Sequence, residues 1–355
     1  MDSKHIISAG ASVIQALERL NALPGNRMTL IVVDSNNRPV GTLTDGDIRR
    51  ALLKGIQPSD PALLAAMSDF QRLVKGEVCV AALKELRGKG ITLIPVVDSD
   101  GYLCDIVDLS NSRTRLPLRA VVMAGGKGER LRPATLTTPK PLLKIEGKAI
   151  IDYNIESLAA VGISDITVTA RYLAHQIKEH FSSPVAGVRV KVVEETEPLG
   201  TIGSVTLCPP AEPEIAGTLV MNSDLLTTIS FEDMFIRHQQ SGADVTIAVI
   251  PYQVSVPYAI LTLDENHPES VRGIEEKPSY SYYANAGIYI FSDKALSLLK
   301  KDARCDATDL IEQAIAAGMP VTYYPIQGTW IDVGSPVDFR QAGELMRHHN
   351  SLSRD

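Results

Sequence analysis

The chain has 355 residues, of which 45% are hydrophobic and 22% charged, and its formal net charge is −7. This length suits two domains, the composition is typical of soluble globular proteins, and the acidic balance argues against a general nucleic-acid-binding protein. No apolar run reaches the roughly 18–20 residues that span a bilayer, and the N-terminus has no secretory signal pattern. The four cysteines have no metal-ligand spacing, so we expect reduced thiols in a cytoplasmic protein that binds neither membrane nor nucleic acid: Cys79, Cys104, Cys208 and Cys305.

The first part of the chain contains one pattern twice. Residues 30–53 and 93–110 each begin with a β-branched run that ends in Asp34 or Asp98, pass through a polar turn and enter a second apolar run. This pattern predicts strand, turn, strand. Apolar residues at helical spacing precede each copy and predict a helix. A repeat that occurs only twice favours a pseudo-symmetric pair over a solenoid.

Residues 41–47, GTLTDGD, resemble the ribose-phosphate signature of CBS domains. Residues 1–113 are therefore identified as a tandem CBS pair, or Bateman module. The resemblance implies that Thr44 contacts the phosphate and Asp47 the ribose of a regulatory nucleotide, and that CBS modules join the chain into a homo-oligomer. The second copy has Asp108 at the corresponding place, but Asp105 replaces the hydroxyl residue. Because Asp47 directly precedes a helical pattern, a role as a helix cap is an equal alternative.

Residues 114–118 form the predicted linker, and a different pattern occupies residues 119–355. Strands alternate there with helices, which predicts an α/β fold with a Rossmann-like mixed sheet covered by helices on both faces. Ligands of such folds bind at the carboxyl ends of the strands. The predicted strands are 120–124, 166–169, 188–193, 218–221, 245–250 and 286–290, and the predicted helices are 150–161, 174–180, 231–241, 294–299 and 309–317.

A glycine-rich and basic loop follows the first of these strands. Glycines let the backbone turn sharply and approach a ligand closely, so that its N–H groups cradle phosphate oxygens. Arginine and lysine add the cations that phosphate binding needs. The spacing fits neither a Walker A loop nor a Rossmann fingerprint, yet the composition predicts a loop that grips a triphosphate. Its residues are Gly125, Gly126, Lys127, Gly128, Arg130, Arg132 and Lys140.

Coupled to Arg-Leu-x-Pro and Pro-Lys-Pro, this loop resembles the signature of sugar-nucleotide pyrophosphorylases, and further motifs follow in the order of that family. The resemblance implies catalytic roles for Arg130, Lys140, Asp224 and Lys277. It implies sugar binding by Glu276, Asn285 and Gly287, with Tyr258 either in the sugar pocket or in the core. It implies nucleotide binding by Ala124, Gly125, Gly126, Gly128, Glu195, Pro198, Gly200 and Thr201.

Asp224 and Asp332 are the two carboxylates that match the family. Asp224 ends an apolar strand, with Ser223 where the family usually has glycine, and Asp332 lies in Trp-Ile-Asp-Val-Gly. Mg²⁺ prefers a few carboxylate oxygens together with phosphates and water, so the pair is predicted to bind Mg²⁺. Either aspartate alone would be interpreted as a turn or cap residue.

The implied reaction transfers a nucleoside monophosphate from a nucleoside triphosphate to a sugar 1-phosphate. The motifs are similar to those of mannose- and heptose-1-phosphate guanylyltransferases. The fused CBS pair resembles the glucosamine-1-phosphate guanylyltransferases of legionaminic acid synthesis, which favours GTP with an amino- or hexose 1-phosphate. Uridylyl or thymidylyl transfer is the alternative within this chemistry. A nucleotide-sensing regulatory protein with a non-catalytic transferase domain is the alternative from another class, and the presence of Lys140, Asp224 and Asp332 argues against it.

Overall fold

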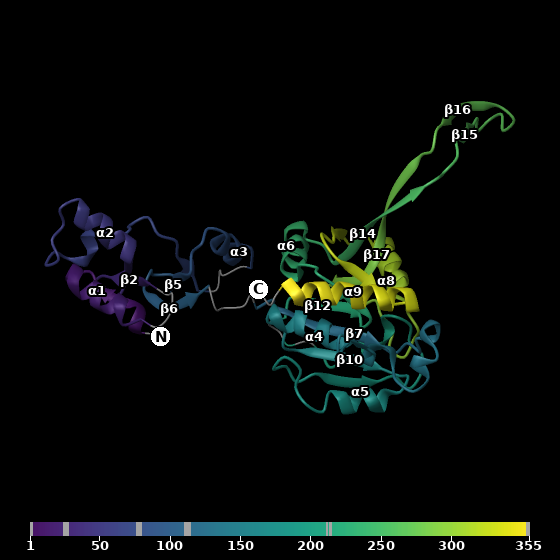
Figure 1. Ribbon diagram of the computed structural model, residues 1–355, viewed down its shortest axis with the longest axis horizontal. Coiled ribbons are helices and arrows are strands. Elements are labelled where there is room, and N and C mark those ends of the chain that lie inside the picture. Colours follow the sequence, from purple (N-terminus) through teal and green to yellow (C-terminus); the bar gives the residue numbers. More distant parts are fainter. Residues whose placement is uncertain are drawn as a thin grey trace. The chain divides into compact units, whose positions relative to one another are not determined.

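The computed structural model of the chain describes residues 3–23, 28–75, 80–109, 115–210, 212 and 215–352. The chain divides into two compact units, Met1–Thr114 and Arg115–Asp355 (Figure 1). Cys79 and the first residue of the predicted linker, Thr114, lie outside the described residues, and Leu118 already belongs to the first strand of the second unit. No described helix is both long and apolar enough to cross a membrane.

The first unit contains two three-stranded sheets with the same topology. In each sheet the first strand pairs parallel with the second, and the second pairs antiparallel with the third. A register shift occurs at the same place in both, between Val32 and Val33 and between Val96 and Val97. The elements are β1 (Ile6–Ser8), α1 (Val13–Asn21), β2 (Thr29–Val33), β3 (Pro39–Thr44) and α2 (Asp45–Leu53), followed by β4 (Leu73–Val74), α3 (Val80–Gly88), β5 (Leu93–Val97) and β6 (Leu103–Asp108).

The two aspartates singled out in the repeat shape equivalent turns. Asp34 Oδ1 accepts hydrogen bonds from the backbone N–H groups two and four residues further on, both at 2.8 Å. Asp98 Oδ1 accepts the same two bonds, at 3.0 and 2.9 Å. The two sheets pack on each other through a small cluster of β-branched and leucine side chains. The expected strand–turn–strand pair is therefore present in both copies.

The second unit is built on a seven-stranded mixed sheet in the order β11-β10-β7-β12-β17-β14-β18. The strand β7 (Leu118–Ala124) pairs parallel with β10 and β12, whereas β17 runs antiparallel to β12 and β14. This confirms the predicted mixed α/β sheet. The other strands are β10 (Ile166–Ala170), β11 (Lys191–Glu194), β12 (Gly217–Asn222), β14 (Val245–Ser255), β17 (Ser279–Phe291) and β18 (Val321–Pro325), with short pairs β8 (Lys144–Ile145) and β9 (Lys148–Ala149), and β13 (Leu225–Thr227) and β19 (Trp330–Asp332).

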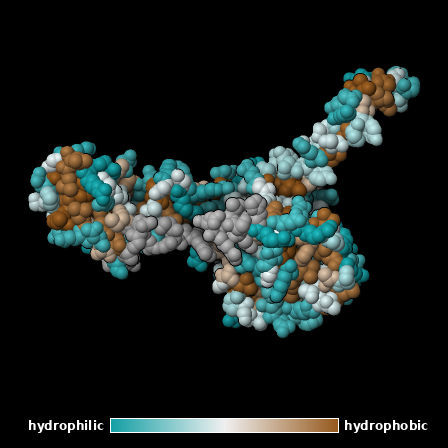
Figure 2. Space-filling view, in the orientation of Figure 1, coloured by the Kyte–Doolittle hydropathy of each residue, from teal (hydrophilic) through white to brown (hydrophobic). Residues whose placement is uncertain are grey.

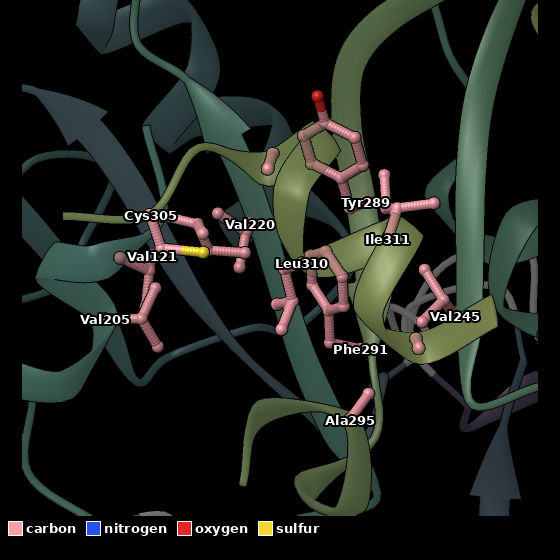
Figure 3. Packing of buried hydrophobic residues seen from close by; sticks show 13 residues of the cluster. Val121, Val205, Val220, Val245, Tyr289, Phe291, Ala295, Cys305, Leu310 and Ile311 are labelled. Atoms are coloured by element: carbon pink, nitrogen blue, oxygen red, sulfur yellow. The ribbon is translucent and has the colours of Figure 1, made fainter. Parts of the chain in front are cut away.

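Helices cover both faces of this sheet. On one face, Leu310 of the helix α8 (Ala307–Ala316) packs among Val121, Val220 and Phe291 (Figure 3). Side chains alternate along a strand, so Thr246, next to buried Val245, points to the opposite face, where His238 Nδ1 of α6 lies 2.8 Å from its hydroxyl. The helices are α4 (Ile150–Ala160), α5 (Ala174–His180), α6 (Phe231–Ser241), α7 (Asp293–Leu296), α8 (Ala307–Ala316) and α9 (Pro336–Leu352).

The largest difference from the predicted elements lies in β14 and β17. The predicted strands 245–250 and 286–290 cover only the parts that lie in the sheet, while the pairing continues to Ser255 and Ser279. Beyond them, β15 (Ile260–Leu263) and β16 (Val271–Glu275) form a further hairpin. Together they project as an arm from this unit (Figure 1). Smaller differences are that α7 ends at Leu296 and that β11 begins only at Lys191.

Candidate active site

A cavity of about 450 Å³ lies at the carboxyl edge of the central strands. Met123 of β7 is level with Asn222 of β12, and Ala124 is level with Ala170 of β10, so three parallel strands end together. The strand order reverses at β7, since β10 and β11 lie on one side of it and β12 on the other. Ligand sites of open α/β sheets lie at such switch points.

The cavity brings together most of the residues predicted to bind nucleotide, from segments far apart in the sequence. Two cations that the sequence reasoning missed also line it, Arg171 and Arg304. Arg171 directly follows β10, so its place at a strand's carboxyl end was a usable signal. Arg304 lies in the connection before α8, for which the sequence offers no such signal. The predicted residues that line the cavity are Ala124, Gly125, Gly126, Lys140, Glu195, Pro198, Gly200, Thr201 and Asp224.

Gly128 fixes the shape of the loop that leaves β7. Its φ of 62° is left-handed, and a Cβ built on it would stand 3.0 Å from both Lys140 Cβ and Thr135 Cγ2. Its carbonyl accepts a hydrogen bond from Thr135 Oγ1 at 2.8 Å. The close approach of this backbone therefore sets the position of Lys140 at the base of the loop. Gly126, by contrast, is exposed and has open space around it, as a phosphate-facing backbone needs.

Lys140 joins the two aspartates that the sequence singles out. It is only 8% exposed, and its ammonium group donates a hydrogen bond to Asp224 Oδ2 and lies 3.6 Å from Asp332 Oδ1. Asp224 follows β12, and Asp332 ends β19, which pairs with β13 so that Leu225 lies opposite Asp332. The short β13–β19 pair thus holds both carboxylates beside one lysine. Pairing of this kind is what allows a lysine to be buried with its charge.

The environment of Asp332 opposes its ionisation. Burial raises the pKa of its carboxyl group, and the negative charge of Asp224 raises it further. Lys140 and Arg130 act in the opposite direction. Arg130 lies close to the backbone that follows Asp332: a Cβ built on Gly334, two residues further on, would stand 3.1 Å from Arg130 Nη2. Two carboxylates in one partly buried place need more positive charge than one lysine supplies.

Two oxygen atoms show where a divalent cation fits. Asp224 Oδ1 and Asp332 Oδ1 are buried, and neither accepts a hydrogen bond from the described residues. Buried carboxylate oxygens without donors are costly unless a cation satisfies them. The described residues contain no cluster of three or more histidine, cysteine or acidic side chains that could hold a metal alone. Two carboxylates with open space beside them suit Mg²⁺, which also takes phosphate and water oxygens.

A tight loop forms the opposite wall of the cavity. Gly200 has a φ of 79°, and a Cβ on it would stand 2.4 Å from the carbonyl oxygen of Cys305. Thr201 is held on both sides: its N–H donates to Asp306 Oδ1 at 2.9 Å, and its hydroxyl accepts from the Ala307 N–H at 2.8 Å. The loop is thereby fixed to the start of α8. Thr201 is thus part of the wall's internal bonding.

The predicted sugar-binding residues are not all gathered at the cavity. Glu276 and Lys277 are exposed on the arm, and neither lines the cavity. Asn285 donates to Tyr289 Oη at 2.9 Å and accepts from the Gly287 N–H at 3.0 Å. Gly287 adjoins the cavity, because a Cβ on it would stand 2.5 Å from Nδ2 of Asn222. Tyr258 lies on the arm and is 74% exposed, so in this chain it belongs neither to the cavity nor to the core.

In the first unit, Thr44 and Asp47 bond to each other. Thr44 is the N-cap of α2, and Asp47 Oδ2 accepts hydrogen bonds from its backbone N–H at 2.9 Å and from its hydroxyl at 2.6 Å. The other oxygen of Asp47 pairs with Arg50 Nη2 at 2.5 Å. This is a complete capping box. The structure therefore contains the helix cap that was the alternative role for Asp47. Nucleotide binding by Thr44 and Asp47 stays a prediction.

Comparison with protein families gives two matches along the chain. The family described as "Nucleotidyl transferase" matches residues 119–348, more than half of the 355-residue chain. The family described as "CBS domain" matches residues 1–54. The first match includes the cavity, and the second includes the first of the two similar sheets.

Curated relatives and solved structures resemble somewhat less than two thirds of the chain. A mannose-1-phosphate guanylyltransferase catalytic subunit beta of Dictyostelium discoideum is 29% identical over 226 residues, and the protein of that name from Drosophila pseudoobscura pseudoobscura is 32% identical over 228. Each match covers 62% of this chain, which spans 62% and 60% of the length of these relatives. The crystal structure of a putative glucose-1-phosphate thymidylyltransferase from Bacillus anthracis superimposes with a TM-score of 0.51 at 23% identity, covering 65% of this chain and 95% of that one, so the fold is shared.

Proposed function

Because the chain belongs to the nucleotidyl transferase family and carries a CBS domain at its N-terminus, we propose that it transfers a nucleoside monophosphate from a nucleoside triphosphate to a sugar 1-phosphate. The products are a nucleoside diphosphate sugar and pyrophosphate. The observation that carries this proposal is the grouping of Lys140, Asp224 and Asp332 beside the glycine loop, with two buried carboxylate oxygens left without donors. It supports a site that gathers phosphates around a cation.

The reaction needs no covalent enzyme intermediate. A phosphate oxygen of the sugar 1-phosphate attacks the α-phosphorus, a new P–O bond forms, and the bond to the β-phosphate oxygen breaks, with its electron pair leaving on pyrophosphate. Such transfers depend on positioning and on charge neutralisation. The backbone N–H groups around Gly125 and Gly126 face the triphosphate. Lys140 and Arg130 steady its charge as the leaving group departs.

Asp224 and Asp332 are the residues that would hold Mg²⁺. When bound, the ion neutralises phosphate charge beside the reacting phosphorus. Before the ion and the substrates bind, the positive charge of Lys140 offsets the repulsion between the two carboxylates. The same two carboxylates argue against the alternative of a non-catalytic regulatory protein, because two buried carboxylates share the single Lys140 ammonium and each keeps one oxygen without a hydrogen-bond donor.

For the substrates we propose GTP and a hexose or amino-hexose 1-phosphate. Two of the relatives are named as mannose-1-phosphate guanylyltransferases, and each match covers 62% of this chain. Glu195, whose carboxylate lies beside Gly125, and the loop at Gly200 form the wall against which a base would lie. Glu276, Lys277, Asn285 and Gly287 are proposed to bind the sugar 1-phosphate. Uridylyl or thymidylyl transfer is the alternative for the base.

A regulatory nucleotide at Thr44 and Asp47 is a further part of this proposal. Its phosphate and ribose would have to replace the hydrogen bonds of the capping box, so binding would loosen the start of α2. Calorimetric titration of the whole chain with AMP, ATP and GTP, beside the Asp47→Asn variant, measures this. A larger heat in the wild type than in the variant supports nucleotide binding at this place, since any binding in the catalytic cavity is common to both, and equal heats contradict it.

The function is tested by a pyrophosphate-release assay with each of the four common nucleoside triphosphates against a panel of sugar 1-phosphates. Asp224→Asn is the matched control, since it keeps the shape of the side chain and removes its charge. We expect release that requires both substrates and Mg²⁺ and that falls by at least roughly 100-fold in the variant. Absence of turnover with every pair, or full activity of the variant, would contradict the proposal.

A further inference from the structure

The arm formed by residues 251–283 has one apolar and one polar face along its stem. In an antiparallel ladder, directly opposed residues project to the same side. Tyr252 lies opposite Tyr282 and Val254 opposite Tyr280, whereas Gln253 opposes a serine on the other side. In the hairpin at the tip, Leu261 lies opposite Ile274 and Leu263 opposite Val271. Apolar pairs on one side and polar pairs on the other are typical of a sheet that packs one face against an apolar surface.

The described part of the chain leaves most apolar side chains of the arm in solvent. Ten of them are between 37% and 74% exposed, and the tip is visibly hydrophobic in Figure 2. Tyr283 alone among the stem tyrosines lies on the side of Gln253, where its ring contacts Tyr323. An isolated two-stranded ribbon is only marginally stable in water, and an apolar patch of this kind marks a contact surface. The exposed side chains are Tyr252, Val254, Tyr258, Leu261, Leu263, Val271, Ile274, Tyr280, Tyr282 and Tyr283.

The same arm carries the sugar-phosphate motif away from its own cavity. Gly287 adjoins the cavity, and Ser279 lies eight residues further along the continuous strand β17. At about 3.4 Å per residue, Ser279 lies roughly 27 Å along the strand from Gly287. Glu276 and Lys277 come after Ser279 in this direction and lie further out on the arm. Ladder pairing from Val249 to Ser255 makes this stem continuous with the central sheet. The arm leaves the sheet at the carboxyl edge, where the cavity opens, because β14 runs in the same direction as β7 and β12.

Lys277, a cation that the arm carries, does not line the cavity of its own chain. The cations that line it are Lys140, Arg171 and Arg304, and Lys140 is already bonded to Asp224. A reaction that brings two phosphate-bearing substrates together needs charge for both of them. Among the described residues Lys277 makes no ion pair, and it stands in solvent with a φ of 46°, at the bend between tip and stem.

We propose that two copies of the chain exchange arms, so that Glu276 and Lys277 of one copy complete the sugar-phosphate site in the cavity of the other. A second copy is the occupant that offers both an apolar surface for the arm and a cavity in need of its lysine. A two-fold exchange covers both arms and completes both cavities at once, and it closes without further association. This inference rests on the proposed function for the identity of the phosphate. It differs from the oligomer expected from the CBS modules, which leaves each cavity with its own arm.

Complementation between two inactive variants tests the exchange. Asp224→Asn damages the cavity and leaves the arm intact, while Lys277→Gln, on the exposed arm, does the reverse. The two chains are co-expressed with different tags, and the mixed dimer is purified through both tags. With exchanged arms, one of its two sites pairs an intact cavity with an intact arm, so we expect about half of the wild-type activity. Wild type co-expressed with the double variant Asp224→Asn/Lys277→Gln should then be almost inactive, since every site contains one damaged part.

The opposite pattern would overturn the proposal. If each arm serves its own cavity, the mixed dimer of single variants is inactive and the dimer of wild type with double variant keeps about half of the activity. Failure of the two tags to co-purify, or full activity of Lys277→Gln alone, would overturn it as well. Urea unfolding of each variant checks that both fold.

A second readout keeps the exchange separate from the proposed function. If the wild type released no pyrophosphate with any substrate pair, the proposed function would fail, and cross-linking would decide the exchange. Light and ¹⁵N-labelled chains are mixed, refolded together and treated with a lysine-specific cross-linker. Links from Lys277 to Lys127, which is exposed in the glycine loop, should join light to heavy chains. Links found only within one label would overturn the proposal.

Discussion

Gly128→Ala should destabilise the second unit, whereas Gly126→Ala, two residues away in the same loop, should not. Gly128 has left-handed backbone angles, φ 62° and ψ 37°, which cost an alanine about 1–2 kcal/mol. The new Cβ would also meet Lys140 Cβ and Thr135 Cγ2 at 3.0 Å, tighter than ordinary contact. Crowding of this kind adds about 1 kcal/mol. The expected loss in the free energy of unfolding is therefore about 2–3 kcal/mol.

Gly126 is the matched control because it lacks both problems. Its φ lies outside the left-handed range and a Cβ on it would meet nothing within 4 Å. Alanine there should change the free energy of unfolding by less than about 0.5 kcal/mol. Both glycines lie beside the predicted phosphate site, so stability separates the steric role of Gly128 from the ligand-facing role of Gly126.

The assay uses the only tryptophan of the chain. Trp330 lies in β19 of the second unit and donates its indole N–H to the Ala286 carbonyl at 2.9 Å, so its fluorescence reports the unfolding of that unit alone. With a urea m-value of about 3 kcal/mol/M for a domain of this size, the Gly128→Ala midpoint should fall by about 0.7–1 M. Equal midpoints for the two variants, or a larger loss in Gly126→Ala, would refute this account of the loop.

Three further outcomes follow from single side chains. Burial raises the pKa of the Cys208 thiol to about 11, so peptide mapping after iodoacetamide treatment at pH 8 should find it unmodified in the folded protein and modified in urea. Burial lowers the pKa of His238, so the unfolded chain takes up a proton at a higher pH than the folded chain does. The free energy of unfolding should therefore fall as pH drops below about 6.5, and less so in His238→Gln; equal pH dependence of both, followed through Trp330 fluorescence, would contradict this. In EDTA, Asp332→Asn should unfold at a temperature no lower than that of the wild type, because the change removes a carboxylate that Asp224 repels. Added Mg²⁺ should raise the unfolding temperature of the wild type and hardly change that of the variant. The same Mg²⁺ shift in both proteins would argue against this metal site.

The sequence predicts the sheet and the glycine loop because their signals are local. A buried apolar run followed at once by Gly125 and Gly126 has only a few structural solutions, and β7 with its loop is one of them. Asp224 was predictable in the same way, because it comes directly after the buried apolar run that forms β12. The helix from 231 to 241 was predictable to the residue because Ser230 caps its start and Gly242 ends it in a left-handed turn.

The contacts that bring Asp332 and Arg304 to the site could not be predicted from local sequence patterns. Pairing of β13 with β19 places Asp332 near Lys140, and these strands of three residues are too short to show a period. Arg304 reaches the cavity from a connection with no pattern of its own. The arm did have a signal, the alternation of Tyr280 and Tyr282 with serines, but beyond the sheet β14 and β17 pair only with each other, so no buried face marks where each strand ends.

Following the phosphorus atoms of the reaction with ³¹P NMR tests the proposed nucleotidyl transfer most directly. Full-length chain, GTP, Mg²⁺ and a hexose 1-phosphate should yield pyrophosphate and a sugar-linked diphosphate in equal amounts. The Asp224→Asn variant should yield neither at a comparable rate. Release of inorganic phosphate or of nucleoside diphosphate without a sugar-linked product, or equal turnover by the variant, would contradict nucleotidyl transfer at the Lys140–Asp224–Asp332 site.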